Sequence, residues 1–304
     1  MEPPWWTSSG PPWRPGPRGV HYPGRNRGRD RRAGSVRDVT TALSDVRPIG
    51  DQLRAWRQRR RLSQLELASE ADVSTRHLSF VETGRSAPSR EMVLRLAEHL
   101  DVPLRDRNLL LVAAGYAPVF GETPIEEPKM DAVRAALKQV LAGHEPYPAV
   151  VVDRFWNLID ANEAAAFFME GAPPELLEPP LNVLRLSMHP DGMAKNILNL
   201  AEWRAHMIDR VRRHVALTAD TALTQLYREL RSFPGDVGEA MAPPADHDVF
   251  VPLRMRVDGR ELSFFSTIAT FGTPVDITVA ELAIESFYPA DAATTGFLRE
   301  RAGW

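Results

Sequence analysis

The stretch of residues 63–85 constrains the fold more than any other part of the chain, because helix caps and a turn follow one another there. Ser63 precedes an apolar run and is expected to cap a short helix, whose inward face begins at Leu65. Ser74 is expected to cap a second helix. That helix should end at Gly84, because glycine adopts the left-handed conformation of a helix C-cap at little cost. The sequence therefore predicts two short helices joined by a tight turn.

The second of these helices carries polar and cationic side chains on the face opposite to its apolar residues. A helix that reads the major groove of DNA needs hydrogen-bond donors for base edges and an N-terminus that faces phosphate. We therefore predict DNA contacts from the start of this helix and from the next residue on the same face: Ser74, Thr75, Arg76 and Ser79. Arg76 is the expected base contact, through a bidentate pair with guanine. A helical hairpin inside a larger domain is the alternative, although a hairpin does not need so regular a series of caps.

Four segments of this region resemble the helix-turn-helix of the lambda-repressor-like, XRE-type regulators: Ser63-Gln64, Leu67-Ala68, Val73-Ser74 and Glu82-Thr83-Gly84-Arg85. The resemblance covers residues 47–117 and implies a DNA-binding domain of five helices. It also implies further DNA contacts, from Gln64 to phosphate and from Arg60 and Arg85. Arg60 lies near the C-terminal end of the first expected helix, where a cation also stabilises the helix dipole, so a structural role is open as well.

Phe80 lies on the predicted reading helix and has two interpretations. Its ring could pack on a thymine methyl group, since this position often contacts DNA in the family that the region resembles. The ring could also be buried against a neighbouring helix, and this second arrangement is the one that we expect.

The length of 304 residues is enough for two domains, and the hydrophobic and charged fractions of 43% and 25% are ordinary for globular proteins. The lack of cysteine excludes disulfides, thiolate zinc sites, iron–sulfur clusters, catalytic cysteines and photoreactive flavin–cysteine sensors. No apolar run approaches the ~20 residues that span a bilayer, and the N-terminus lacks the apolar segment of a signal peptide. We therefore expect a cytoplasmic protein without a membrane partner.

Charge is distributed unevenly behind the formal net charge of -3. Residues 1–46 carry about +4 and residues 47–117 about +3, whereas the remainder carries about −10. Such a chain can approach a polyanion in only one orientation. Residues 1–46 are rich in Arg, Pro and Gly, and we predict that they are disordered because they cannot bury enough apolar surface. They could form a basic arm that strengthens DNA binding, a partner-binding tail, or an extension without a role.

The second half of the chain carries strand signals at both ends and helix signals between them. The predicted strands are Ala149–Val152, Asn157–Asp160, Val249–Val257, Arg260–Ala269 and Thr278–Ser286. This order is that of a PAS-type sensor, in which an antiparallel sheet curls around a cavity. We therefore predict a multidomain protein of α and α+β class, with a five-helix, lambda-repressor-like domain over residues 47–120. A PAS-like antiparallel sheet with flanking helices should follow over residues 121–304.

Several motifs of the second half are similar to the ligand-binding domain of the MmyB-like regulators: Tyr147-Pro148-Ala149, Asp153-Arg154, Trp156-Asn157, residues 180–193, Glu202-Trp203-Arg204 and Asp220. The similarity covers residues 103–233. It implies a PAS-like pocket for a small apolar effector, with fatty acids as the associated ligand class and no other cofactor.

Large apolar side chains are more numerous in this half than a small sheet needs, and methionine and aromatic groups suit a deformable cavity. We predict that six of them contact the ligand: Trp156, Phe167, Phe168, Trp203, Met207 and Phe265. Arg185 and His189 are predicted to meet a carboxylate head group, which arginine can bind through a bidentate fork. Each apolar side chain could instead belong to the core. Arg185 could pair with an acidic neighbour, and His189 could cap the turn at residues 191–192.

Three other functions are open from the sequence. An enzyme lacks support, because the chain has no phosphate-binding glycine loop, Gly-x-Ser-x-Gly elbow or His-Glu-x-x-His motif. A haem-binding PAS sensor and an assembly module whose helix-turn-helix meets protein are the other two. We expect none of these, but a homodimeric transcription regulator that binds an inverted repeat in double-stranded DNA.

Overall fold

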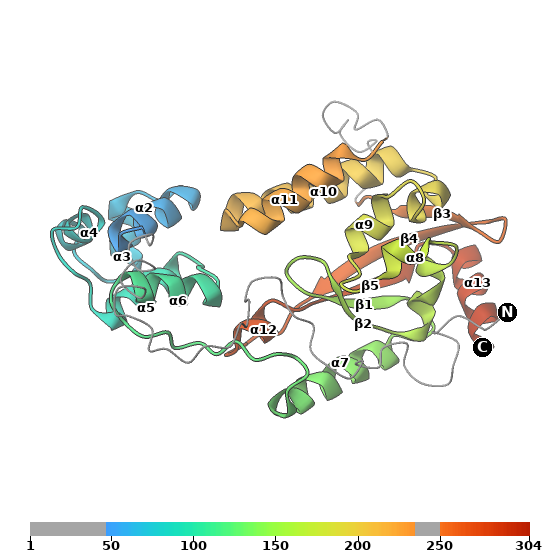
Figure 1. Cartoon of the computed structure of the whole chain (residues 1–304), viewed down its shortest axis with the longest axis horizontal. Coiled ribbons are helices and arrows are strands. Elements are labelled where there is room, and N and C mark those ends of the chain that lie inside the picture. Colours follow the sequence, from blue (N-terminus) through green and yellow to red (C-terminus); the bar gives the residue numbers. More distant parts are fainter. Residues whose placement is uncertain (1–46, 235–249) are drawn as a thin grey trace, which may run out of the picture. The chain divides into compact units, whose positions relative to one another are not determined.

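The structure is a computed structural model that describes residues 47–234 and 250–304 (Figure 1). The chain separates after Val119 into two units, each of which is described by itself. The first unit is helical, with elements α2 (Ile49–Arg59), α3 (Gln64–Glu70), α4 (Thr75–Glu82), α5 (Arg90–His99) and α6 (Leu104–Ala113). The predicted tail, residues 1–46, lies outside the described residues.

The two predicted serine caps begin α3 and α4. The Ser63 hydroxyl accepts a hydrogen bond from the Glu66 amide at 3.1 Å, and the Glu66 carboxylate accepts from the Ser63 amide at 2.7 Å. These two bonds form a capping box, which satisfies two amides that the first turn of a helix leaves free. The Ser74 hydroxyl accepts from the His77 amide at 3.1 Å. The pair of short helices predicted for residues 63–85 is therefore confirmed.

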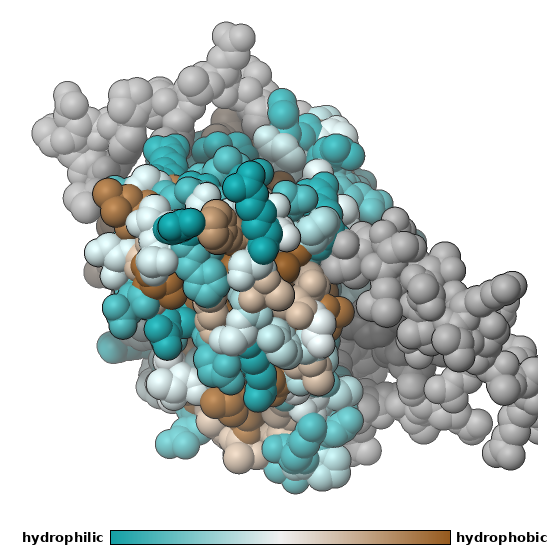
Figure 2. Space-filling model, turned by 90° about the vertical axis from the view of Figure 1, so that its left-hand side faces the viewer, coloured by the Kyte–Doolittle hydropathy of each residue, from teal (hydrophilic) through white to brown (hydrophobic). Residues whose placement is uncertain are grey.

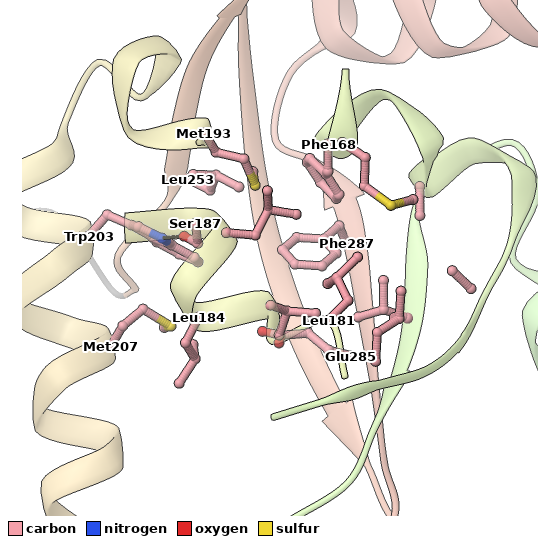
Figure 3. A pocket seen from close by; sticks show the side chains of 17 residues that line it. Phe168, Leu181, Leu184, Ser187, Met193, Trp203, Met207, Leu253, Glu285 and Phe287 are labelled. Atoms are coloured by element: carbon pink, nitrogen blue, oxygen red, sulfur yellow. Dashed lines mark hydrogen bonds between the residues drawn. The ribbon is translucent and has the colours of Figure 1, made fainter. Parts of the chain in front are cut away.

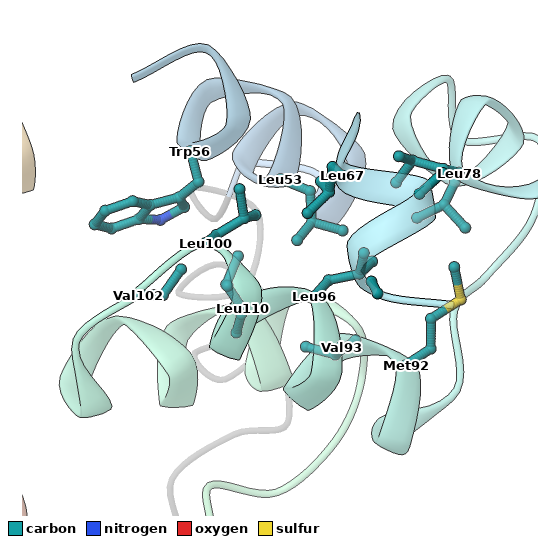
Figure 4. Close-up of a cluster of buried hydrophobic side chains, with 14 of the residues drawn as sticks. Leu53, Trp56, Leu67, Leu78, Met92, Val93, Leu96, Leu100, Val102 and Leu110 are labelled. Carbon is teal, nitrogen blue, oxygen red and sulfur yellow. The ribbon is translucent and has the colours of Figure 1, made fainter. Parts of the chain in front are cut away.

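Apolar side chains from all five helices form the core of the first unit (Figure 4). Each helix contributes at least one fully buried leucine: Leu53, Leu67, Leu78, Leu96 and Leu110. Full burial of a leucine contributes about 1.5–3 kcal/mol relative to its exposure, so this cluster supplies much of the stability of the unit.

Leu65 departs from the predicted inward face, since its side chain is 68% exposed. Residues two positions apart lie on nearly opposite sides of a helix. Leu67 and Ala68 are buried in the core, so α3 turns Leu65 towards solvent.

The second unit, from Phe120 to Trp304, contains a five-stranded antiparallel sheet in the order β2-β1-β5-β4-β3. Its strands are β1 (Ala149–Val152), β2 (Leu158–Ala161), β3 (Leu253–Val257), β4 (Arg260–Ala269) and β5 (Ala283–Pro289). The last strand of the chain is therefore the centre of the sheet, where it pairs with both β1 and β4. This arrangement confirms the predicted antiparallel sheet with helices around it.

Helices fill the long connection between β2 and β3, one short helix separates β4 from β5, and others precede β1 and follow β5 (Figure 1). They are η1 (Pro128–Met130), α7 (Asp131–Gly143), η2 (Glu163–Met169), α8 (Pro174–Leu177), α9 (Val183–Met188), η3 (Met193–Asn196), α10 (Leu200–Thr218), α11 (Thr221–Ser232), α12 (Ile277–Ala280) and α13 (Ala292–Ala302). The segment that carries the two adjacent phenylalanines forms the 3-10 helix η2, and Asn162 caps it as predicted.

Alternation along the central strands divides the sheet into two faces. Val151 and Ile284 pair across β1 and β5 and pack on Leu137 and Leu141 of α7. The neighbouring residues of these strands, Val150 and Glu285 among them, therefore point to the opposite face. That face carries the candidate ligand pocket.

The predicted strand Thr278–Ser286 is wrong in its first half. Residues Ile277–Ala280 form the short helix α12, and β5 begins only at Ala283. The Asp276 carboxylate caps this helix by accepting from the Thr278 amide at 2.9 Å, and it also accepts from the Thr123 hydroxyl at 2.7 Å. An aspartate cap therefore outweighs the strand preference of the β-branched residues that follow it.

Candidate functional site

The first turn of α4 is accessible to solvent. Ser74 and Arg76 are exposed, and Thr75 and Ser79 are partly exposed. Seen from the side on which Figure 1 draws α3 and α4, the surface is mostly hydrophilic with scattered apolar residues (Figure 2). The four side chains that we predicted from the residues alone are thus accessible to a partner.

Two arginines flank the ring of Phe80 on α4. The guanidinium carbons of Arg76 and Arg85 lie 5.4 Å and 6.0 Å from the centroid of the ring. Phe80 is only partly buried, so the expectation that it belongs to the core is not met. Cation–π attraction instead keeps the two positive groups near one apolar ring at the surface.

The other end of α4 is fixed by Glu82, whose side chain is fully buried. Its two carboxylate oxygens accept from Arg57 at 2.7 Å and 2.8 Å, and the Gln64 amide donates to one of them at 2.8 Å. Burial raises the pKa of Glu82, but the hydrogen bonds from Arg57 and Gln64 outweigh it and hold the pKa below its usual value. One carboxylate therefore connects α2, α3 and α4.

Gln64 and Arg60 both have partners inside the first unit, although we predicted DNA contacts for them. The Gln64 amide donates to Glu82. The Arg60 guanidinium donates to the carbonyl oxygens of Leu100 and Asp101, at 2.8 Å and 2.7 Å, and so satisfies groups that the end of α5 leaves free. We therefore leave both residues out of the DNA contacts proposed below.

A cavity of about 60 Å³ lies in the second unit (Figure 3). Its lining includes Val150 and Glu285, so it is on the face of the sheet opposite to α7. Strands β1 and β5, the 3-10 helix η2 and helices α9 and α10 supply most of its wall. Three predicted ligand contacts line it: Phe168, Trp203 and Met207. Two more methionines, Met169 and Met193, also face it, and flexible thioether side chains allow such a wall to adapt to its contents.

The other three predicted aromatic contacts lie outside the cavity wall. Phe167 packs on Phe168 with 4.4 Å between the ring centroids. Phe265 points to the other face of the sheet, where it stacks on Tyr288 at 5.1 Å, because successive residues of a strand alternate in direction. Trp156 is buried beneath the guanidinium of Arg210, whose central carbon lies 4.4 Å from the ring.

The two predicted head-group residues do not line the cavity either. The Arg185 guanidinium forms a bidentate pair with Glu229, at 2.6 Å and 2.9 Å. The His189 ring nitrogen Nδ1 accepts from the Asp191 amide at 3.1 Å. Both side chains therefore have the structural roles that we stated as alternatives.

Sequence reasoning missed Glu285, an ionisable residue that lines the cavity. Its side chain comes from the central strand β5, and the residue is 5% exposed. The Ser266 hydroxyl donates to Oε1 at 2.9 Å, and Arg210 Nη1 lies 3.4 Å from the same oxygen. Glu285 shares its face of β5 with Phe287, and its place between the apolar residues Ile284 and Phe287 is the signal that the sequence offers.

Burial lowers the pKa of the Arg210 guanidinium, an effect that its neighbour Glu285 opposes. Arginine starts from so high a pKa that it stays charged at neutral pH. The polar end of the cavity wall is therefore a buried carboxylate with a cation behind it.

Family models match both units of the chain. A model described as the MmyB-like transcription regulator ligand binding domain matches residues 133–300, and one described as a helix-turn-helix domain matches residues 48–110. No curated protein matches the chain. Within residues 47–234 and 250–304, no helix has both the length and the apolar character needed to cross a membrane.

Proposed function

The chain belongs to the transcription regulators with an MmyB-like ligand-binding domain, and from this premise we propose a ligand-responsive repressor or activator that binds DNA as a homodimer. The observation that carries the proposal is that the two units offer the two halves of such a function. The first has a helix whose first turn is open to solvent and carries Arg76, and the second contains a cavity with apolar walls. Both matched families are regulatory and neither is enzymatic.

Helix α4 is proposed to enter the major groove, with Arg76 bound to a base edge. Ser74, Thr75 and Ser79 assist it with shorter donors, and Arg85 adds a second cation beside Phe80. Such a helix covers only a few base pairs, so a homodimer would be needed to read an inverted repeat whose half-sites lie one helical turn or a multiple of it apart.

The effector is proposed to be a small molecule with an aliphatic chain of the fatty-acid type, bound in the cavity of the second unit. Support comes from the lining, which is almost entirely apolar. The volume of about 60 Å³ holds several water-sized groups, so a long chain requires the wall to move outward. Met169, Met193 and Met207 make this movement inexpensive.

The test of the DNA half is selection of binding sites from random duplexes with the full chain, followed by titration of the best site. Arg76→Ala should weaken binding to that site by about 1–3 kcal/mol and relax the preference at one base pair. Arg90→Ala is the matched control, because Arg90 is also exposed but begins α5. An equal loss on all sequences would mean that Arg76 contacts phosphate. Salt-independent binding would contradict the proposal as a whole.

The test of the ligand half is mass spectrometry of small molecules extracted from the folded full chain, with each identified compound added back to the DNA titration. An apolar compound that changes DNA affinity supports the proposal. A Soret absorption band in the purified protein would contradict it and indicate a haem sensor.

A further inference from the structure

The cavity of the second unit is apolar except at two places. Glu285 is the ionisable side chain that faces it among the described residues, and Ser187 adds a hydroxyl that accepts from the Trp203 indole nitrogen at 3.0 Å. Figure 3 shows both side chains within an apolar wall that includes Leu184 and Phe287. A buried carboxylate is costly unless it has partners, so its presence in such a wall calls for an explanation.

The partners of Glu285 occupy only one of its two oxygens. Ser266 and Arg210 both contact Oε1, at 2.9 Å and 3.4 Å. For Oε2, the described part of the chain offers no hydrogen-bond donor, although an ionised carboxylate can accept at both oxygens. The residue lines the cavity and is only 5% exposed, so a molecule inside the cavity can reach its carboxylate. Oε2 is therefore an open acceptor in the wall of the cavity.

Arg210, the cation that contacts Glu285, cannot bind a head group in the cavity in the same way. It does not line the cavity, and its guanidinium packs on the face of Trp156 with 4.4 Å to the ring centroid. A head group that enters the cavity therefore meets the carboxylate first. A second carboxylate placed there would be repelled in a surrounding of low dielectric constant, whereas a donor would complete the hydrogen bonding of Glu285.

We propose that this pocket selects an aliphatic ligand whose head group donates a hydrogen bond to Glu285, such as an alcohol or a primary amine, over the same chain with a carboxylate. This inference rests on the proposed function, since it assumes that the cavity is the effector site. It keeps the aliphatic chain of the proposed effector but replaces the carboxylate of a fatty acid by a donor head group. It also replaces Arg185 and His189 by Glu285 as the residue that recognises this head group.

The experiment compares 1-octanol, octylamine and octanoate, which share one chain length, by calorimetric titration into the full-length protein at neutral pH. The alcohol or the amine should bind more tightly than octanoate by on the order of tenfold, the contribution expected of a hydrogen bond to a charged group. A preference for the amine would indicate an ionic head group, and a preference for the alcohol a neutral one. Both results support the proposal.

Glu285→Gln should reduce the difference between octylamine and octanoate to less than about threefold, because it removes the charge and keeps the shape. Glu261→Gln is the control, since Glu261 is an exposed β4 carboxylate that pairs with Arg256. The ranking in the unmodified protein decides the matter even if Glu285→Gln fails to fold. Tightest or equal binding of octanoate would overturn this inference and leave the apolar effector site standing. Failure of all three compounds to bind would overturn the effector site as well.

Discussion

Replacement of Glu82 should strongly destabilise the DNA-binding unit. Its side chain is fully buried and accepts three side-chain hydrogen bonds, two from Arg57 and one from Gln64. Loss of one partner of a buried ion pair costs about 3–5 kcal/mol, because the other charge remains buried without compensation. Arg57 would be left close to this state, since its side chain is only 12% exposed and would keep only its hydrogen bond to the Leu62 carbonyl oxygen.

Set against the stability of a domain of this size, about 4–11 kcal/mol, Glu82→Ala should remove a large part of the total. At roughly 4–8 °C per kcal/mol for a small domain, the melting temperature of the first unit should fall by well over 10 °C. The assay is scanning calorimetry of the full chain, in which the two units can give separate transitions. Glu91→Ala is a suitable control, because Glu91 is exposed on α5.

The sign of the pH dependence gives an independent check. The folded-state pKa of Glu82 lies below its ordinary value, so the stability that its ionised form contributes is present above the unfolded-state pKa, about 4.3. It is lost as the pH falls through the lower folded-state pKa. The difference in stability between the unmodified protein and Glu82→Gln should therefore be constant from pH 6 to pH 8 and shrink below about pH 4.3. A fall of less than about 2 °C for Glu82→Ala, or a difference that does not change with pH, would refute the reasoning.

Three further outcomes are expected. Arg204→Met should destabilise the second unit by about 3 kcal/mol in urea titrations. The buried Arg204 guanidinium donates to carbonyl oxygens at the end of α11, among them those of Phe233 and Pro234. An unchanged midpoint of unfolding would show that these bonds contribute nothing. Met207→Trp should fill the cavity and lower octanol affinity by about tenfold, while DNA affinity without ligand is unchanged. An octanol affinity equal to that of the unmodified protein would place the ligand elsewhere. Deletion of residues 1–38 should leave the selected DNA sequence unchanged and at most lower affinity and its salt dependence. A different selected sequence would show that this segment reads bases.

Local signals made the helix-turn-helix predictable. A capping serine and its partner amide lie three residues apart, so Ser63 and Ser74 act through contacts that are visible in the sequence itself. The sheet could be predicted for a similar reason, because short apolar runs such as Ala149–Val152 are local strand signals. The helix α12 was missed, since a single aspartate, Asp276, determines its start.

Side chains whose partners are distant in the sequence could not be assigned in advance. Arg60 donates to carbonyl groups 40 residues away and Arg185 pairs with a carboxylate 44 residues away. Phe264 and Phe265 look alike as neighbours, and only the register of β4 decides that the first points inward. Glu285 resembles an ordinary solvent-facing charge until β5 is known to be the central strand.

Helix α4 combines two tasks at opposite ends. Leu78, Val81 and Glu82 anchor it in the core, whereas Thr75 and Arg76 at its start have no part in that anchoring. If the first turn reads DNA as proposed, substitutions there can change which operator is recognised without a loss of folding stability to be compensated elsewhere. Over evolutionary time such a helix can be redirected to new promoters one residue at a time.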